Sequence, residues 1–558
     1  MNAAIAGASE KLDALRSRLP AHPATILAGA AMVVSGALLL RWMSRLTFWR
    51  DEWDFLLHRE GWSLDTFLQP FAEQLLAIPI LSYRTLQTAF GMDDPLPYQI
   101  VSVALFLLSV AMVFIYMRRR LGEWLALAAV LPILFLGPSW DDLLFPFQMA
   151  LFGSVSSGVA ALLLLERRDR AGDVGAAVLL FLSLFFFDLG ICFVAAATIE
   201  LAFGRDRWRR AYVVAVPTAI WLLWYAIWGH EAHTFISFGN FARSPSYMLD
   251  GLAASLATWV GLGTEAYDTT KLDWGRPLLV LALGLGALRL YTMRRFSPRL
   301  VATAVLLFGF WFLVALNTNP LAPATAGRYQ YLGIVLMALF VAELAAGLRA
   351  RWYAVALIVL AAVMAATTNG VRLRDAAIGL AGVAEQQRGG LAALELARDE
   401  VDPDFLLTQE NSGVDYLGWL DAGSYLDAVD QYDSPAYSPS GLASAPDNAR
   451  TSADTVSAAA LGVGFQPAGA GFEACRRLDL RGGPAVIELP PEGIVLESAR
   501  TGTDASLRRY ATGSFPVSLG ALEPRSPVLL RTPPDRSTLP WTLELAGGGP
   551  VTACRASP

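Results

Sequence analysis

Long apolar runs, each close to the length of a membrane span, recur through the first two thirds of this 558-residue chain. Hydrophobic residues make up 55% of the sequence and charged residues only 16%, which is little charge for a soluble chain of this length. A helix needs about 20 apolar residues to cross the hydrocarbon core of a bilayer. The sequence therefore predicts a polytopic α-helical membrane protein, with the lipid bilayer as its first partner.

Eleven membrane spans are predicted from these runs. They cover about 24–42, 96–117, 121–137, 145–165, 174–187, 189–204, 211–228, 276–292, 299–317, 329–348 and 352–367. The apolar stretch 174–204 is too long for one span and is interrupted at Asp188, so two short helices are predicted there. A polar, partly basic segment with Lys11, Arg16 and Arg18 precedes the first span, which favours a retained signal anchor.

Short arginine-rich connections determine the predicted orientation. They lie at 118–120, 166–170, 205–210, 294–299 and 349–351. The positive-inside rule places such loops in the cytoplasm. All of them face inward if the N-terminus is cytoplasmic and the stretch 250–264 does not cross. We therefore expect 250–264 to form an interfacial or re-entrant helix within an outer loop, 229–275, and the C-terminus to lie outside.

The chain divides by composition into three predicted regions. These are a transmembrane domain at 1–367, including a first outer loop at 43–95, an extracytoplasmic helical and irregular segment at 368–470, and a β-rich domain at 471–558. Short strand-like runs in the last region, separated by Pro and Gly, predict a small β-sandwich. The extracytoplasmic part is thus expected to be α+β.

Two of the three cysteines, Cys475 and Cys554, bracket the β-rich region, whereas Cys192 lies within an apolar run. Disulfides form in oxidising compartments outside the cytoplasm. If the C-terminal region is extracytoplasmic, Cys475 and Cys554 are expected to form a disulfide. Cys192 is expected to be a small core residue.

The first outer loop begins with an unusual cluster, Trp49-Arg50-Asp51-Glu52-Trp53. Ionisable residues next to a membrane span are costly and point to a function. Asp51 and Glu52 are adjacent, so one can face a substrate while the other orients it, binds a metal or caps a helix. The alternative is an interfacial helix in which these acids occupy the first turn and interact favourably with the helix dipole. The tryptophans are expected to hold the loop in the membrane interface.

A second acidic pair follows Trp140 on another predicted outer loop. Asp141 and Asp142 offer carboxylate oxygens of the kind that hard divalent cations bind. The alternative is that Asp142 caps the helix that follows. Gln148, one turn into that span, would face the same cavity or simply pack.

Basic residues on the predicted outer side supply candidate anion sites. Arg328 opens a span there against the positive-inside bias, which favours an anionic partner such as a lipid phosphate. Arg84 lies on an amphipathic stretch, 75–90, and is expected to be solvated or to contact a lipid phosphate. His230 could bind a headgroup, although no metal-ligand spacing surrounds it.

Several function classes are disfavoured. The chain has no phosphate-binding loop, no nucleophile elbow and no basic tract that would suggest a nucleic-acid partner. Charged residues within the predicted spans are scarce, which argues against a proton-coupled pump.

The plan resembles the integral-membrane glycosyltransferases of the GT-C fold, which include protein mannosyltransferases, aminoarabinose transferases and the arabinofuranosyltransferases of bacterial cell walls. Asp51-Glu52 matches their early acidic pair, and Glu73-Gln74 sits where some members have a second polar motif. Asp141-Asp142 looks like a second acidic site of some members. The architectural match covers the whole chain, but the motif match covers only these residues.

The resemblance implies an inverting transferase on the outer face of a bacterial plasma membrane. It would move a sugar from a polyprenyl phosphate to a glycan, lipid or protein acceptor of the cell envelope. Asp51 and Glu52 would be the catalytic residues, with either one as general base and Asp51 preferred, and Arg328 would stabilise the departing phosphate.

The other candidate residues fall into three groups. They are Glu52, Asp141 and Asp142 for the acceptor or a divalent cation (Mg²⁺, Mn²⁺ or Ca²⁺); Arg50 and Arg84 for the phosphate; and Glu73, Gln74, Trp140, Gln148 and His230 for substrate. Two alternatives stay open: a polysaccharide polymerase or ligase of another membrane fold, and a non-catalytic transport partner that would tolerate Asp51→Asn.

Overall fold

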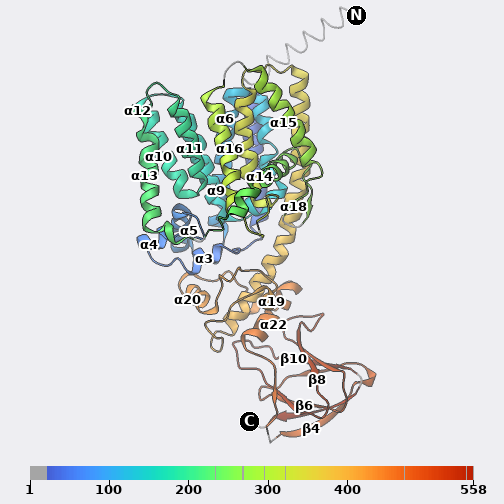
Figure 1. The fold of residues 1–558 in the computed structure, drawn as a ribbon. Coiled ribbons are helices and arrows are strands. Elements are labelled where there is room, and N and C mark those ends of the chain that lie inside the picture. Colours follow the sequence, from blue (N-terminus) through green and yellow to red (C-terminus); the bar gives the residue numbers. More distant parts are fainter. Residues whose placement is uncertain are drawn as a thin grey trace, which may run out of the picture. The chain divides into compact units, whose positions relative to one another are not determined.

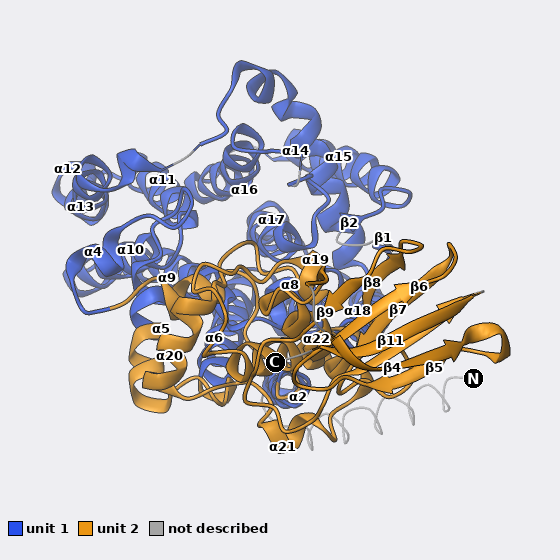
Figure 2. Ribbon diagram, turned by 90° about the horizontal axis from the view of Figure 1, so that it is seen from below, with its two compact units in different colours: residues 1–43, 61–82, 98–377 blue, residues 44–60, 83–97, 378–558 orange. Residues whose placement is uncertain are grey.

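The computed structural model describes residues 22–232, 234–266, 269–293, 296–320, 322–469, 472–547 and 549–556. The predicted signal anchor's basic segment and the pair Arg294-Arg295 lie outside these residues. The chain forms two compact units, coloured separately in Figure 2. Unit 1 comprises 1–43, 61–82 and 98–377, and unit 2 comprises 44–60, 83–97 and 378–558.

Unit 1 is helical. Its α-helices are α2 (Pro23–Met43), α4 (Leu64–Leu68), α6 (Leu96–Leu121), α7 (Glu123–Val130), α8 (Trp140–Leu143), α9 (Met149–Leu165), α10 (Arg170–Phe186), α11 (Leu189–Ala202), α12 (Arg207–Arg210), α13 (Tyr212–Ile227), α14 (Phe238–Trp259), α15 (Gly275–Thr292), α16 (Pro298–Leu316) and α17 (Gln330–Ala345). Short elements are η1 (Ile133–Phe135), η2 (Gly137–Ser139), η3 (Pro146–Gln148), η4 (Gly229–Glu231), η5 (Gly327–Tyr329) and the hairpin β1 (Glu265–Ala266) with β2 (Thr269–Thr270). The helices α5 (Ala77–Phe90) and α18 (Trp352–Leu396) run from one unit into the other.

Each predicted span coincides with a helix or a short series of helices. Within the described residues, six helices are long and apolar enough to cross a membrane, and a bent pair, Glu123–Phe135 with Gly137–Leu143, makes up to seven. The chain is therefore a multi-pass helical membrane protein, while the eleven-span topology stays a prediction. The break predicted at Asp188 is present, because α10 ends at Phe186 and α11 begins at Leu189.

The helix predicted at 250–264 has different bounds. It is α14, which begins at Phe238 and ends at Trp259, and it packs against α15, α16 and α17. The ring of Trp311 lies 2.2 Å from the position that a Cβ on Gly251 would take. Small residues on α14, such as Gly251, thus let α16 approach closely. The shorter interfacial helix that the sequence predicts does not account for this packing.

The last predicted span does not end at residue 367. It continues without interruption as α18, a helix of 45 residues that ends at Leu396. The stretch 368–396 is rich in Ala and Leu and has no proline, which favours the continuation of the helix although the stretch also contains five Gly.

Ion pairs gather several arginine-rich connections at one end of unit 1. Arg120 Nη2 lies 2.8 Å from Glu166 Oε1, and its Nε also bonds Glu343. Arg299 lies 3.1 Å from both Glu166 and Glu200. The ends of α6, α9, α11, α16 and α17 are thereby tied together. The connections 118–120, 166–170 and 294–299 thus lie on one side of the helical unit, as the positive-inside argument requires.

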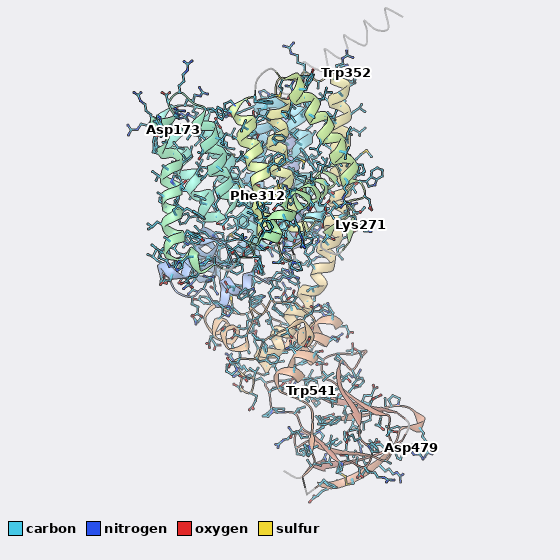
Figure 3. The ribbon with its side chains drawn as sticks, viewed as in Figure 1. Asp173, Lys271, Phe312, Trp352, Asp479 and Trp541 are labelled. Carbon is cyan, nitrogen blue, oxygen red and sulfur yellow. A yellow bond between two sulfur atoms is a disulfide. The ribbon has the colours of Figure 1, made fainter. Side chains whose placement is uncertain are left out.

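A further pair joins the start of α10 to the connection at 205–210. Arg210 Nη2 lies 2.6 Å from Asp173 Oδ1. Figure 3 shows Asp173 and Trp352, the first residue of α18, at the same end of unit 1. The two remaining arginine-rich connections, 205–210 and 349–351, therefore also lie at this end.

Unit 2 combines short helices with two β-sheets. Its helices are α3 (Glu52–Leu57), α19 (Gln409–Ser412), α20 (Ala422–Tyr432), α21 (Pro439–Leu442) and α22 (Asp447–Ala460), with η6 (Leu480–Gly482). Its strands are β3 (Phe465–Pro467), β4 (Phe472–Asp479), β5 (Ala485–Glu488), β6 (Ile494–Ser498), β7 (Thr503–Arg508), β8 (Val517–Leu522), β9 (Val528–Leu530), β10 (Thr542–Gly547) and β11 (Pro550–Ala556).

The strands form a β-sandwich, visible in red at the C-terminal end in Figure 1. One sheet has the order β5-β10-β7-β8 and the other the order β3-β9-β6-β11-β4. Leu496, Leu507 and Leu543 are fully buried in its core. A disulfide joins Cys475 on β4 to Cys554 on β11, the pair that the sequence singled out.

Two segments of the predicted first outer loop fold as part of unit 2. The side chain of Gln387 donates to the carbonyl of Phe48 at 2.7 Å, and the backbone N–H of Met92 donates to the carbonyl of Tyr432 at 2.7 Å. Because 44–60 and 83–97 share a compact unit with 378–558, the start of the first loop and the C-terminal region must lie on the same side of the membrane.

Candidate functional site

Arg328 begins the turn that leads into α17, and a close backbone contact fixes its surroundings. A Cβ on Gly327 would lie 2.3 Å from the carbonyl oxygen of Pro138 and 3.1 Å from Asp141 Oδ1. The hydroxyl of Ser139 donates to the carbonyl of Gly327 at 3.0 Å. Only glycine permits this approach, which brings the Asp141 carboxylate beside the Arg328 backbone.

The Arg328 side chain is exposed, and its guanidinium lies 5.3 Å from the centre of the Tyr329 ring. Its charge interacts with that of Asp141. An exposed guanidinium can bind two oxygens of one phosphate at once. An anion-binding role of Arg328 stays a prediction.

Asp142 is fully buried next to this arginine. Its charge interacts with those of Asp141 and Arg328, and neither of its oxygens has a hydrogen-bond partner among the described residues. The helix-capping alternative does not apply, because Gln148 occupies the N-cap position of α9. A buried carboxyl group without a partner is costly, and such groups often serve a function.

Glu73 reaches the same region from a tight turn. Phe71 and Gln74 exchange backbone hydrogen bonds of 3.0 and 2.9 Å, and Ala72 has a φ of +50°, which is strained for a residue with a side chain. Glu73 Oε1 accepts a hydrogen bond of 2.8 Å from Asn317, at the end of α16. Burial raises the pKa of Glu73, while Asn317 and the charge of Arg328 oppose this shift.

Asp188 adds an acidic group that the sequence marked only as a helix break. It lies at the N-cap of α11, and the backbone N–H of Leu75 donates to it. Burial raises the pKa of Asp188 to about 7, and the negative charge of Glu73 adds to this shift. Asp188 thus changes its charge near neutral pH. An acid between two apolar helices was the available signal, but its proximity to Glu73 depends on tertiary packing.

These residues form one cluster in unit 1, which we call the Arg328 cluster and define as Glu73, Asp141, Asp142, Asp188, Asn317 and Arg328. Its acids can accept hydrogen bonds from sugar hydroxyls, and its arginine can bind a phosphate. The described residues include no group of three or more His, Cys, Asp or Glu side chains placed to hold a metal ion. Hard cations take six or more oxygen ligands. A divalent cation at Asp141 and Asp142 stays a prediction.

The first acidic pair belongs to unit 2, where Glu52 is fully buried. Its Oε2 accepts a hydrogen bond of 2.7 Å from the backbone N–H of Trp49, and its Oε1 accepts one from the hydroxyl of Tyr83. Both oxygens are therefore engaged in holding the loop to α5. Glu52 fits a positioning role better than a catalytic one.

Asp51 has a different environment. It is half-buried at the N-cap of α3, where its side chain makes no capping hydrogen bond. Trp53, in contrast, is fully buried, and its ring packs edge-on against Phe48 and Tyr425 at 5.8 and 6.0 Å. The expectation that Trp53 anchors the loop in the membrane interface is therefore wrong, because its ring belongs to the core of unit 2.

Both other arginines proposed for phosphate contact have partners within unit 2. Arg50 has a φ of +40°, and its Nη2 lies 3.1 Å from Asp415 Oδ2. Arg84 is only 7% exposed and donates to Gln87 at 3.0 Å and to the Tyr432 hydroxyl at 2.9 Å. Arg84 is therefore not the solvated side chain that the sequence predicted, since its guanidinium stabilises packing between α5 and α20.

The remaining predicted substrate residues are spread through unit 1. Gln74 closes the turn that presents Glu73, and Trp140 starts α8 with its ring 6.2 Å from that of Phe145. Gln148 is half-buried at the start of α9, and His230 is exposed in η4. No distance relates Gln148 or His230 to the Arg328 cluster, so their roles stay predictions.

No protein-family model matches the chain, and no curated protein matches it. Among solved structures, the chain is similar to ArnT from Cupriavidus metallidurans bound to undecaprenyl phosphate. The two are 11% identical, with a TM-score of 0.43, and the match covers 74% of this chain and 88% of the other.

Proposed function

We propose that this protein is a membrane glycosyltransferase that moves a sugar from a polyprenyl phosphate to a glycan, lipid or protein acceptor of the cell envelope. The observation that carries the proposal is the Arg328 cluster, in which the charge of an exposed arginine interacts with buried and half-buried acids in a multi-pass helical unit. The guanidinium of Arg328 can bind a phosphate, and the carboxylates of the cluster can accept hydrogen bonds from sugar hydroxyls. The resemblance of Asp51-Glu52 to the acidic pair of GT-C enzymes supports the same reaction.

Arg328 is the proposed ligand of the departing lipid phosphate. Its exposure leaves it accessible to a lipid headgroup, and the Gly327–Pro138 contact holds its backbone in place. As the bond between the anomeric carbon and the phosphate oxygen breaks, negative charge grows on that oxygen. A charge-assisted hydrogen bond from a guanidinium stabilises this charge.

Asp51 is the proposed general base. It would take the proton of the acceptor hydroxyl while the hydroxyl oxygen bonds to the anomeric carbon, so that the sugar changes hands with inversion. Glu52 would hold the loop through Trp49 and Tyr83. Asp51 is half-buried and Glu52 is not accessible, which is the reason for preferring Asp51.

The test of the base compares Asp51→Asn with Asp93→Asn in a cell-extract assay of glycan transfer. Asp93 is an exposed acid of the same loop. We expect Asp51→Asn to reduce transfer by about two to four orders of magnitude and Asp93→Asn to leave it unchanged. Full activity in Asp51→Asn would exclude this role and favour a non-catalytic transport partner.

The test of the phosphate site uses decaprenyl phosphate, which carries no sugar and thus reports binding without reaction. Arg328→Gln should weaken its binding to purified protein by roughly ten- to a hundredfold, the loss of one or more hydrogen bonds to a charged group. Arg243→Gln, at an exposed arginine of the same unit, should bind normally. Equal binding by all three proteins would remove Arg328 from the site.

A further inference from the structure

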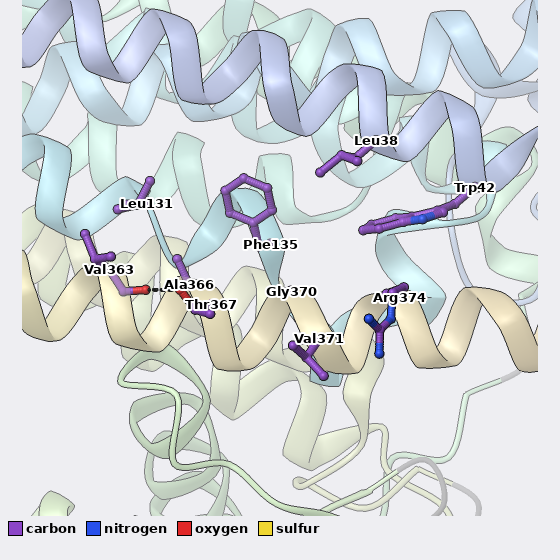
Figure 4. A pocket seen from close by; sticks show the side chains of 10 residues that line it. All are labelled: Leu38, Trp42, Leu131, Phe135, Val363, Ala366, Thr367, Gly370, Val371 and Arg374. Atoms are coloured by element: carbon purple, nitrogen blue, oxygen red, sulfur yellow. Dashed lines mark hydrogen bonds between the residues drawn. The ribbon is translucent and has the colours of Figure 1, made fainter.

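A groove in unit 1 shares no lining residue with the Arg328 cluster. It has a volume of about 440 Å³ and runs between α2, the α7–η1 segment and α18. Figure 4 shows Trp42 and Arg374 at one end of the groove and Leu131 and Val363 at the other. Each of the elements that form it belongs to a candidate membrane span.

The lining of this groove is apolar along most of its length. Leu38 and Phe135 project into it on the side across from α18, the helix that carries Val363 and Gly370 (Figure 4). The hydroxyl of Thr367 donates its hydrogen bond to the carbonyl of Val363 at 2.8 Å, so this proton is not available to a ligand. A Cβ on Gly370 would lie 3.6 Å from Phe135 Cβ, an ordinary van der Waals contact, so a side chain larger than that of alanine at this position would occupy the groove.

The length of the groove matches one leaflet of a bilayer. Its lining on α18 extends from Val363 to Arg374, which at 1.5 Å per residue is roughly 16 Å. Half of the hydrocarbon core is about 15 Å thick. Tryptophan and arginine are typical of the membrane interface, so the end with Trp42 and Arg374 corresponds to the headgroup level.

Arg374 supplies the charge at that end. Its guanidinium lies 2.8 Å from Asp375, but the two side chains are 54% and 58% exposed. Exposed ion pairs of this kind contribute little stability, so a phosphate can share or replace the carboxylate at small cost. An apolar channel of one-leaflet length that ends at an accessible cation is complementary to an anionic phospholipid.

We infer that this groove binds an acyl chain of an anionic phospholipid, whose phosphate contacts Arg374. The inference does not depend on the proposed transferase activity, because none of the lining residues belongs to the Arg328 cluster or to the first outer loop, 43–95, which contains Asp51. It assigns α2 and α18 a structural lipid that fills the space between them.

Native mass spectrometry of the purified full-length protein with phosphatidylglycerol tests this inference. Gly370→Leu should fill the groove and remove one retained lipid per protein. Gly29→Leu is the matched control, because it adds the same side chain to open space on α2. An unchanged lipid count in Gly370→Leu, with the control also unchanged, would overturn the inference.

The charge at Arg374 is tested by competition. Arg374→Gln should lose the preference for phosphatidylglycerol over phosphatidylcholine, whereas Arg205→Gln, at another exposed arginine, should keep it. A preference that persists in Arg374→Gln would contradict the headgroup contact. Displacement of phosphatidylglycerol by decaprenyl phosphate at equal concentration would instead assign the groove to the polyprenyl lipid and overturn the phospholipid assignment.

A measurement on the unmodified protein covers the case in which Gly370→Leu does not fold. Phosphatidylglycerol with a photoreactive diazirine in its acyl chain should crosslink to peptides that contain 38–42 or 363–374. Labelling confined to other apolar helices would overturn the inference.

Discussion

The hydroxyl of Tyr83 donates a hydrogen bond to the carboxylate of Glu52, and both side chains are fully buried. This contact joins the first helix of the Asp51 loop, α3, to the second half of α5 within unit 2. The two acids therefore differ in environment. Glu52 is fixed inside unit 2, whereas Asp51 is half-buried. The predictions below begin with this contact.

Replacing Tyr83 with Phe should destabilise unit 2, because it leaves a buried carboxylate oxygen without its donor. A buried acceptor that loses its partner costs about 1–3 kcal/mol. The thermal unfolding midpoint of the purified protein measures this effect. Tyr291→Phe, at a tyrosine that is 89% exposed, is the control, and equal midpoints for the two variants would show that the Tyr83 contact contributes nothing.

His58 should make the stability of unit 2 depend on pH. Its Nδ1 lies 3.5 Å from Asp54 Oδ1, and its Nε2 lies 3.2 Å from Asp421 Oδ2. The hydrogen bond to Asp54 raises the pKa of His58, burial opposes this, and Asp421 adds to it. Arg59 also faces this group, at 3.1 Å from Asp54.

Because the folded-state pKa of His58 is raised, its contribution is full below the unfolded pKa of about 6.5 and is lost as pH rises through the folded value. His58→Asn should therefore flatten the fall in unfolding free energy that begins as pH rises above about 6.5. His230→Gln, at the exposed histidine of η4, should leave the slope unchanged. A slope that survives in His58→Asn would assign it to other groups.

Gly327→Ala should disturb the Arg328 cluster without changing any charge. The added Cβ would lie 2.3 Å from the Pro138 carbonyl, and overpacking of this kind typically costs 1–3 kcal/mol. The chain segment before Asp141 or the turn at Arg328 must then shift. Decaprenyl phosphate binding and the unfolding midpoint should both fall, whereas Gly284→Ala, which meets open space, should change neither.

The orientation of the chain can be tested with single cysteines and a membrane-impermeant maleimide. Cys192 is buried, and the other two cysteines form a disulfide, so the background is low. Asp93→Cys and Ser440→Cys should label on intact cells, and Arg205→Cys only after permeabilisation. Labelling of Asp93 and Ser440 from opposite sides would contradict their membership of one compact unit.

Local sequence patterns were sufficient for part of the fold. Apolar runs located the helices, the acid at 188 marked the break between α10 and α11, and Pro- and Gly-bounded runs located β5, β6, β9 and β10. The bounds predicted for α14 were too short, whereas the helical pattern predicted after residue 367 forms one continuous helix, α18, with the last predicted span.

The candidate site was predicted only as separate pieces. Charge and membrane topology placed Glu73, Asp141, Asp142 and Arg328 on the same predicted side, and the structure brings their charges together within unit 1. The burial of Glu52 and Trp53 could not be predicted, because it depends on Tyr83 and Tyr425. Contacts between separate elements, 31 residues apart for Glu52 and Tyr83 and far more for Trp53 and Tyr425, leave no trace in local periodicity.

The folding of residues 44–60 with the C-terminal region has a consequence for synthesis. His58 and Asp421 are 363 residues apart in the sequence, so at 5–20 residues per second the ribosome needs roughly 20–70 s to make the second after the first. During that interval residues 44–60 can pack against α5, but they lack their C-terminal partners Asp421 and Tyr425. A chain that terminates before Asp421 should therefore reach the membrane without a complete unit 2, which makes full translation a requirement for the folding of its first outer loop.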